Sequence, residues 1–122
     1  MTRTATLVLI TILAGIRASL ASPIGLWKAH DDATIEIKPC GQNLCGIVIS
    51  TQPWSYDPKT GKPDYSDKYN VEGEKRHRSR VGIEVLIGMK RSGPSKWSGQ
   101  LYNDRNGHTY QGDLIEVGPG RI

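Results

Sequence analysis

Short apolar runs with a period of two, separated by turn residues, are the feature that most constrains how this chain can fold. Residues 33–38 (ATIEIK) alternate in this way, with Ile35 and Ile37 on one side. Residues 45–51 (CGIVIST) form a second, β-branched run after a short turn. A period of two is typical of strands with one buried face, whereas an amphipathic helix needs a period of about 3.6. The two runs therefore predict a β-hairpin.

Further runs of the same kind occupy 24–28, 82–91, 96–103 and 108–117. The last two flank Asp104-Arg105-Asn106-Gly107, and Asn-Gly is a strong hairpin-turn signal. The sequence thus predicts an all-β fold, an antiparallel up-and-down meander of about six strands. The Gly118-Pro119-Gly120 turn is followed by only two residues. Because such a turn normally introduces another strand, we expect a barrel that is incomplete at the C-terminus.

Residues 53–80 form a long polar loop with no convincing strand or helix pattern. Pro58, Gly61, Pro63 and Gly73 interrupt it. A loop of this length is uncommon in a compact domain and is often functional or mobile. We expect it to gate the mouth of the β-structure.

Residues 1–21 have the layout of a secretory signal peptide. Arg3 precedes the uncharged apolar stretch 7–16, and the small residues Ser19 and Ala21 follow it. The apolar stretch is about half the ~20 residues that a membrane-spanning helix needs. We expect cleavage after Ala21, which leaves 22–122 as a single periplasmic or secreted domain with no transmembrane segment.

The charge balance does not favour a nucleic-acid partner. The whole chain has a formal net charge of +4, but Arg3 and Arg17 belong to the predicted signal, so cleavage lowers the charge by two. So small a positive charge predicts no strong preference for nucleic acid or for an anionic membrane surface.

The two cysteines of the chain are Cys40 and Cys45. An exported protein enters an oxidising compartment, where a nearby pair is expected to form a disulfide. A metal pair would need further ligands, and the candidate histidines His30, His77 and His108 are far apart in the sequence. A redox pair usually has two intervening residues before a helix. We therefore predict a structural disulfide that closes a short loop and contributes about 2 kcal/mol.

Several motifs in order resemble the bacterial family known as domain of unknown function 2147. They are Gly25-Leu26-Trp27, the run CGQNLCGIV from Cys40, Gly61-Lys62-Pro63, Asp67-Lys68-Tyr69-Asn70, Arg78 four residues before Gly82, and the blocks GIEVLIGMK, WSGQLYN and NGHTYQG. The resemblance covers about residues 24–117. It implies a secreted or periplasmic, lipocalin-like β-barrel and no established activity. The chain departs from the family in having Ser79 where Pro is frequent. It also lacks the further C-terminal strands, which often carry a second cysteine pair and a Trp.

Four residues are candidates for contact with a ligand. Trp97 and Tyr110 lie at strand positions, where large aromatic residues either line a cavity or fill the core. Trp54 and Arg78 lie in the long loop, where they could contact a ligand or partner. For Arg78 an ion pair with Asp67 is the favoured structural alternative to a ligand carboxylate.

No residue is predicted to be catalytic, and no metal or cofactor is predicted. The chain has no HExxH, no GxSxG and no cysteine left as a nucleophile once the disulfide forms. Asp57, Asp64, Asp67 and Asn70 could supply oxygen ligands to calcium, but their spacing matches no EF-hand loop. We expect them to be solvated loop residues, and the basic run 75–80 to be solvated or ion-paired.

These observations favour a non-enzymatic binder of a small apolar or amphipathic ligand. The apolar space is expected to be enclosed by Ile35, Ile37, Ile47, Ile49, Val85, Leu101, Tyr110 and Leu114. This inference rests on fold analogy. A cell-envelope structural or protein-interaction module with a filled core is the alternative, and a hydrolase or isomerase is less favoured.

Overall fold

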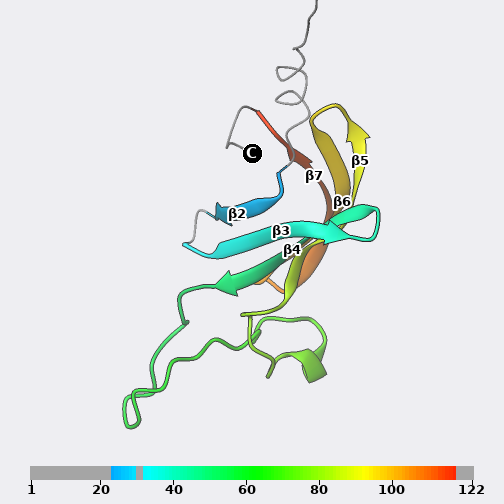
Figure 1. Cartoon of the computed structure of the whole chain (residues 1–122). Coiled ribbons are helices and arrows are strands. Elements are labelled where there is room, and N and C mark those ends of the chain that lie inside the picture. The colour runs from blue at the N-terminus through cyan, green and yellow to red at the C-terminus, as the bar shows by residue number, and fades with distance from the viewer. Residues whose placement is uncertain (1–22, 30–31, 118–122) are drawn as a thin grey trace, which may run out of the picture.

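The computed structural model describes residues 23–29 and 32–117, which fold into one six-stranded antiparallel sheet (Figure 1). The strands follow one another in space as in the sequence: β2 (Gly25–Lys28), β3 (Thr34–Cys40), β4 (Asn43–Ser50), β5 (Glu84–Gly93), β6 (Lys96–Asn103) and β7 (His108–Ile115). The predicted all-β meander is confirmed. The expected signal, 1–21, and the turn at 118–120 lie outside the described residues. Within the described ranges no helix is long and apolar enough to cross a membrane.

The β3–β4 hairpin carries the predicted disulfide between Cys40 and Cys45, whose Cα atoms are 5.8 Å apart. Cys40 pairs with Asn43, so the loop is Gly41-Gln42. Gly41 has a φ of +64°, which suits the first central position of a type II′ turn. The two-residue loop fixes the register of the hairpin. We call this the hairpin end of the sheet, and we call the opposite end, where β4 leaves and β5 returns, the loop end.

The register of β4 differs from the sequence expectation. Gly46 lies opposite Ile37 and Val48 lies opposite Ile35, so these β4 residues share the inner face. Ile47 and Ile49 therefore face outward, and Ile49 is 42% exposed. Their expected place in the apolar interior was wrong, because an unbroken apolar run permits either register.

Two register shifts bend β5 between Glu84 and Lys90, and a third lies between Arg91 and Gly93 at the turn into β6. Ile47 pairs with Glu84 but Gly46 pairs with Leu86, so β5 has one extra residue there, and a further register shift lies near Gly88, whose φ is +56°. These are β-bulges, which bend a strand and redirect its side chains. Leu86 is directed to the inner face and Met89 is fully buried.

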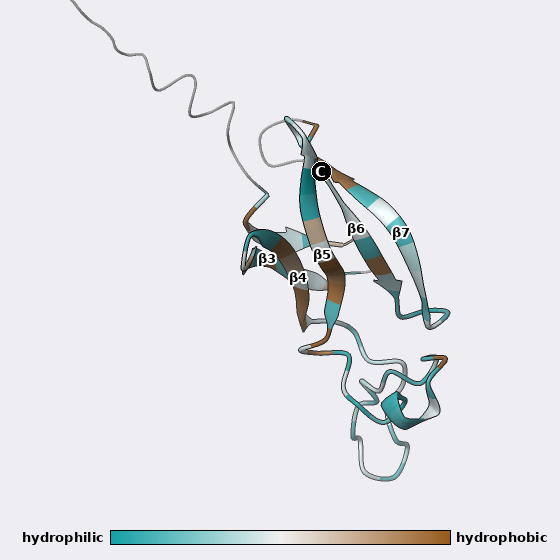
Figure 2. Cartoon of the chain, turned by 90° about the vertical axis from the view of Figure 1, so that its right-hand side faces the viewer, coloured by the Kyte–Doolittle hydropathy of each residue, from teal (hydrophilic) through white to brown (hydrophobic). Residues whose placement is uncertain are grey.

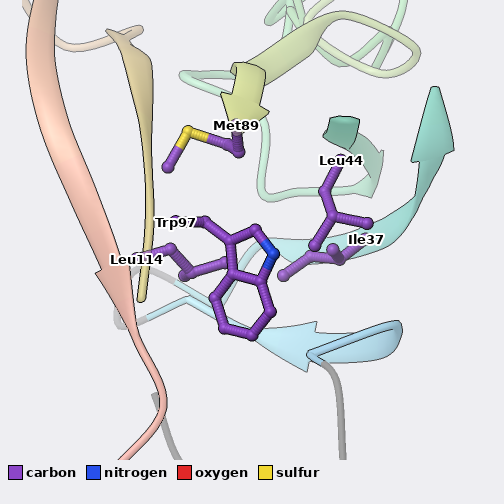
Figure 3. Packing of buried hydrophobic residues seen from close by; sticks show 5 residues of the cluster. All are labelled: Ile37, Leu44, Met89, Trp97 and Leu114. Atoms are coloured by element: carbon purple, nitrogen blue, oxygen red, sulfur yellow. The ribbon is translucent and has the colours of Figure 1, made fainter. Parts of the chain in front are cut away.

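The main core lies at the hairpin end. Its buried residues are Ile37, Leu44, Met89, Trp97 and Leu114. The indole of Trp97 occupies the centre, with Leu114 on one side and Ile37 and Leu44 on the other (Figure 3). A smaller cluster of Val48, Ile83 and Val85 lies toward the loop end.

The sheet is curved but open, because β2 and β7 are its two edges and do not pair with each other. The polar loop between β4 and β5 extends beyond the loop end (Figures 1 and 2). It has some order of its own, since Tyr56 forms a bridge with Pro63, Ser66 forms one with Ser79, and a short 3₁₀ helix, η1, spans Gly73–Lys75. The loop is therefore a partly ordered segment that lies beyond the loop end of the sheet.

Candidate functional site

An open pocket of about 570 Å³ lies on the inner face of the sheet toward the loop end. We call it the inner pocket. Its lining residues are Ala29, Ala33, Ile35, Val48, Val85, Leu86, Leu101, Tyr102, Asn103, Asp104 and Arg105. The strand residues make an apolar floor, and the β6–β7 turn contributes the polar groups at one end. An apolar cavity with a few polar groups at one place is typical of small-molecule sites.

Glycines on the inner face explain why the pocket remains open. A Cβ atom at Gly46 would lie 2.7 Å from Leu86 Cγ, and one at Gly112 would lie 2.4 Å from Leu101 Cδ1. Both leucine side chains thus lie directly over glycine backbone. Because they lie low against the sheet, the space above them is not filled, whereas Trp97 fills the hairpin end.

A buried arginine joins the long loop to the polar end of the inner pocket. Arg80 is 2% exposed, and its guanidinium carbon lies 3.9 Å from the ring centroid of Trp54. Its Nη2 donates to the Gln52 carbonyl oxygen at 2.8 Å, and its Nη1 lies 3.5 Å from Asp104 Oδ2. A buried charge needs this combination of ion pair, hydrogen bonds and ring stacking. Arg80 therefore fixes the position of the β6–β7 turn relative to the loop.

A second polar network attaches the loop to β6. The carboxylate of Asp67 is fully buried and accepts hydrogen bonds from Tyr102 Oη at 2.6 Å and from Asn70 Nδ2 at 2.9 Å. Arg78 Nε donates to it at 2.9 Å, which is the ion pair expected from the sequence. The expectation that Asp67 and Asn70 are solvated was wrong, because the loop folds back on itself and encloses both.

The phenol of Tyr102 has a perturbed titration in this network. Burial raises the pKa of Tyr102 above its ordinary value, and the hydrogen bond to Asp67 and the carboxylate charge raise it further. The phenol is therefore held in its protonated form, in which it can donate to Asp67.

The loop also contacts the β6–β7 turn through backbone. Gly107 has a φ of +76°, and a Cβ atom placed on it would lie 1.7 Å from the Tyr69 carbonyl oxygen. The sequence predicted a turn at this position, but it did not predict the close approach of Gly107 to the Tyr69 backbone. Gly107 is required here both for its backbone conformation and for its lack of a side chain.

The four residues expected to contact a ligand do not share one pocket. Trp97 lies in the core at the hairpin end. Tyr110 lies on the inner face of edge strand β7, 47% exposed, and its hydroxyl accepts from Asn106 Nδ2 at 2.7 Å. Trp54 lies under Arg80, whereas Arg78 lies over the ring of Tyr102, 5.9 Å from its centroid.

Ile35, Val85 and Leu101, which were expected to enclose the apolar space, do line the inner pocket, but other lining residues were not expected there. Leu86 and the polar residues Asp104 and Arg105 are the main additions. The inward direction of Leu86 was not predicted, because the β5 bulge shifts the alternation of side chains by one residue. Asp104 looked like an ordinary turn residue, and Arg80 resembled the other cations of its basic run. The separation of Trp54 and Arg80 along the sequence did not predict that their side chains would be in contact.

Comparison with known proteins now identifies the family. The family model described as an uncharacterized protein conserved in bacteria, domain of unknown function 2147, matches residues 25–121. The chain belongs to this family. No curated protein matches it.

A solved structure supports the fold. Protein HP1028 from the human pathogen Helicobacter pylori, described as belonging to the lipocalin family, superposes with a TM-score of 0.59 at 20% sequence identity. The match covers 80% of this chain and 64% of that one. At this identity the likeness shows the fold alone, and it confirms that the domain of unknown function 2147 chain is lipocalin-like.

Proposed function

We propose that this protein binds one small amphipathic molecule in the inner pocket and has no catalytic role. The observation that supports the proposal best is the pocket itself, about 570 Å³ of space above an apolar floor. That volume lies within the range of sites for drug-sized ligands. A core filled throughout, as the structural alternative requires, is less well supported, because the main core lies at the hairpin end and the smaller cluster toward the loop end leaves the inner pocket open.

The distribution of polar groups favours an amphipathic over a purely apolar ligand. Ile35, Val48 and Val85 offer only apolar surface, while Asn103, Asp104 and Arg105 gather at the β6–β7 turn. A polar head group would find hydrogen-bond partners at this end and leave the floor to an aliphatic or aromatic tail. The buried Arg80–Asp104 pair holds the turn in place.

The proposed site of action is the periplasm or the extracellular space. The Cys40–Cys45 disulfide supports an oxidising compartment. The proposed signal, residues 1–21, would deliver the mature domain 22–122 there.

Native mass spectrometry with a matched pair of variants tests the proposal. Decanoate is a suitable amphipathic probe, and the exported wild-type protein should take up one molecule. Leu101→Trp places a large ring in the inner pocket and should weaken uptake at least about tenfold, since an overfilled site cannot accept the tail. Gln100→Trp makes the same change one residue earlier on the exposed outer face of β6 and should bind like the wild type.

Two results would count against the proposal. The first is a wild-type protein that takes up no decanoate and carries no resident molecule after detergent-free purification. The second is a Leu101→Trp variant that is folded and binds as tightly as Gln100→Trp.

A further inference from the structure

A second pocket, of about 230 Å³, lies on the other side of the sheet, against the loop segment around η1. We call it the outer pocket. Tyr102 and Thr109 are paired across β6 and β7 and alternate with the inner-face pair Leu101 and Tyr110, so they point outward. Tyr102 borders both pockets. Its charged lining residues are Glu72, Lys75, Arg78 and Glu84.

Arg78 presents unused hydrogen-bond donors to the outer pocket. Its Nε is fixed by Asp67 at 2.9 Å, and its guanidinium lies over the Tyr102 ring. Within the described part of the chain, neither Nη atom forms a hydrogen bond, and the side chain is 39% exposed. A planar guanidinium held along one edge offers its other edge to a carboxylate in a bidentate arrangement.

Glu84 presents an unused acceptor to the same pocket. It is the first residue of β5 and is exposed. Its carboxylate has no ion pair or hydrogen bond among residues 23–29 and 32–117. The two other charged residues of the lining, Glu72 and Lys75, pair with each other at 3.2 Å. Among the charged side chains of the lining, Glu84 therefore has no ion-pair partner in the described residues, and Arg78 has an unoccupied Nη edge.

The charge balance selects the class of ligand. The lining holds two cations, Lys75 and Arg78, and two carboxylates, Glu72 and Glu84, so it is neutral. Next to it, the carboxylate of Asp67 and the guanidinium of Arg76, whose Nε donates to the Asn70 carbonyl at 2.7 Å, add one charge of each sign. A purely anionic ligand would leave Glu84 unmatched, and a purely cationic ligand would leave the Arg78 donors unmatched. A ligand with one charge of each sign satisfies both groups.

We propose that the outer pocket binds a small zwitterion of the amino-acid class. The carboxylate of the ligand lies on the Nη edge of Arg78 and its ammonium group lies on Glu84. The volume of the pocket is below that of a drug-sized site, which suits so small a ligand. This site is distinct from the inner pocket and does not depend on the function proposed for it.

Backbone amide NMR titration of the full mature protein tests the inference. Glycine and glycylglycine serve as zwitterions with different charge separations, and acetate and methylammonium serve as the corresponding single charges. At least one zwitterion should shift amide signals of 72–78 and 84–87 with a Kd about tenfold or more below those of both single-charge probes. If neither zwitterion binds more tightly than acetate and methylammonium, the inference is wrong.

Two carboxylate variants provide the matched control. Glu84→Gln removes the proposed ammonium partner from an exposed position and should weaken zwitterion binding about tenfold. Glu36→Gln makes the same change on the same outer face, where Glu36 pairs with Ile47 and Ile47 pairs with Glu84, and should bind normally. Equal binding by the two folded variants would also overturn the inference.

Discussion

The Tyr102 hydroxyl is the most informative single group to remove. In Tyr102→Phe, Asp67 Oδ1 loses a hydrogen bond of 2.6 Å and Asn70 Nδ2 loses a contact of 3.1 Å. Asp67 keeps its contacts with Asn70 and Arg78 on its other oxygen, but one buried oxygen is left unsatisfied. Hydrogen bonds to buried charged groups contribute about 1.5–3 kcal/mol. We expect the free energy of unfolding to fall by about 2 kcal/mol, which lowers the Tm of a domain of this size by roughly 10 °C.

Urea denaturation followed by tryptophan fluorescence measures this loss, and Tyr110→Phe is the matched control. The hydroxyl of Tyr110 contacts only an exposed amide, Asn106, so its removal should cost less than about 0.5 kcal/mol. If the two variants are equally stable, the Asp67 network does not hold the loop on the sheet, and the reasoning above is refuted.

Two further predictions concern the same contact between loop and sheet. Because the folded-state pKa of Tyr102 is raised, its contribution to stability is complete below the ordinary value of about 10 and is lost as the pH rises above it. The difference in unfolding free energy between wild type and Tyr102→Phe should therefore shrink above pH 10, and a constant difference in urea titrations at pH 8 and 11 would contradict this. Gly107→Ala should cost more than the roughly 1–2 kcal/mol of positive φ alone, since its Cβ would overlap the Tyr69 carbonyl. Gly61→Ala has a similar φ of +74° and nothing within 4 Å, so it should show only the conformational cost, and equal melting temperatures of the two variants would argue against the close approach.

The strands could be predicted from the sequence because alternation and turn chemistry agree with each other. The β3–β4 hairpin and its disulfide follow from one short turn, and the Asn-Gly signal places the β6–β7 turn. The face of β4 could not be predicted, since Ile47, Val48 and Ile49 are all apolar and either register buries part of the run. The β5 bulges could not be predicted either, because one extra residue shifts the alternation of inward and outward side chains by one position.

The candidate sites were harder to predict because their residues meet only through tertiary contacts. The Arg78–Asp67 pair was anticipated because both residues belong to the matching motifs. The burial of Arg80 was not, since its partners Trp54 and Asp104 are each more than twenty residues away. A polar segment as long as this loop is normally solvated, and the burial of Asp67, Asn70 and Arg80 depends on tertiary contacts that cannot be predicted from composition.

The central claim is that the space at the loop end, rather than the core at the hairpin end, receives the ligand. Isotope-filtered NMR on methyl-labelled protein with unlabelled decanoate tests it directly. The account predicts nuclear Overhauser contacts from the decanoate chain to the methyl groups of Val48, Val85 and Leu101, and none to those of Leu44 and Leu114. Contacts confined to Leu44 and Leu114, or no contacts at saturating decanoate, would contradict it.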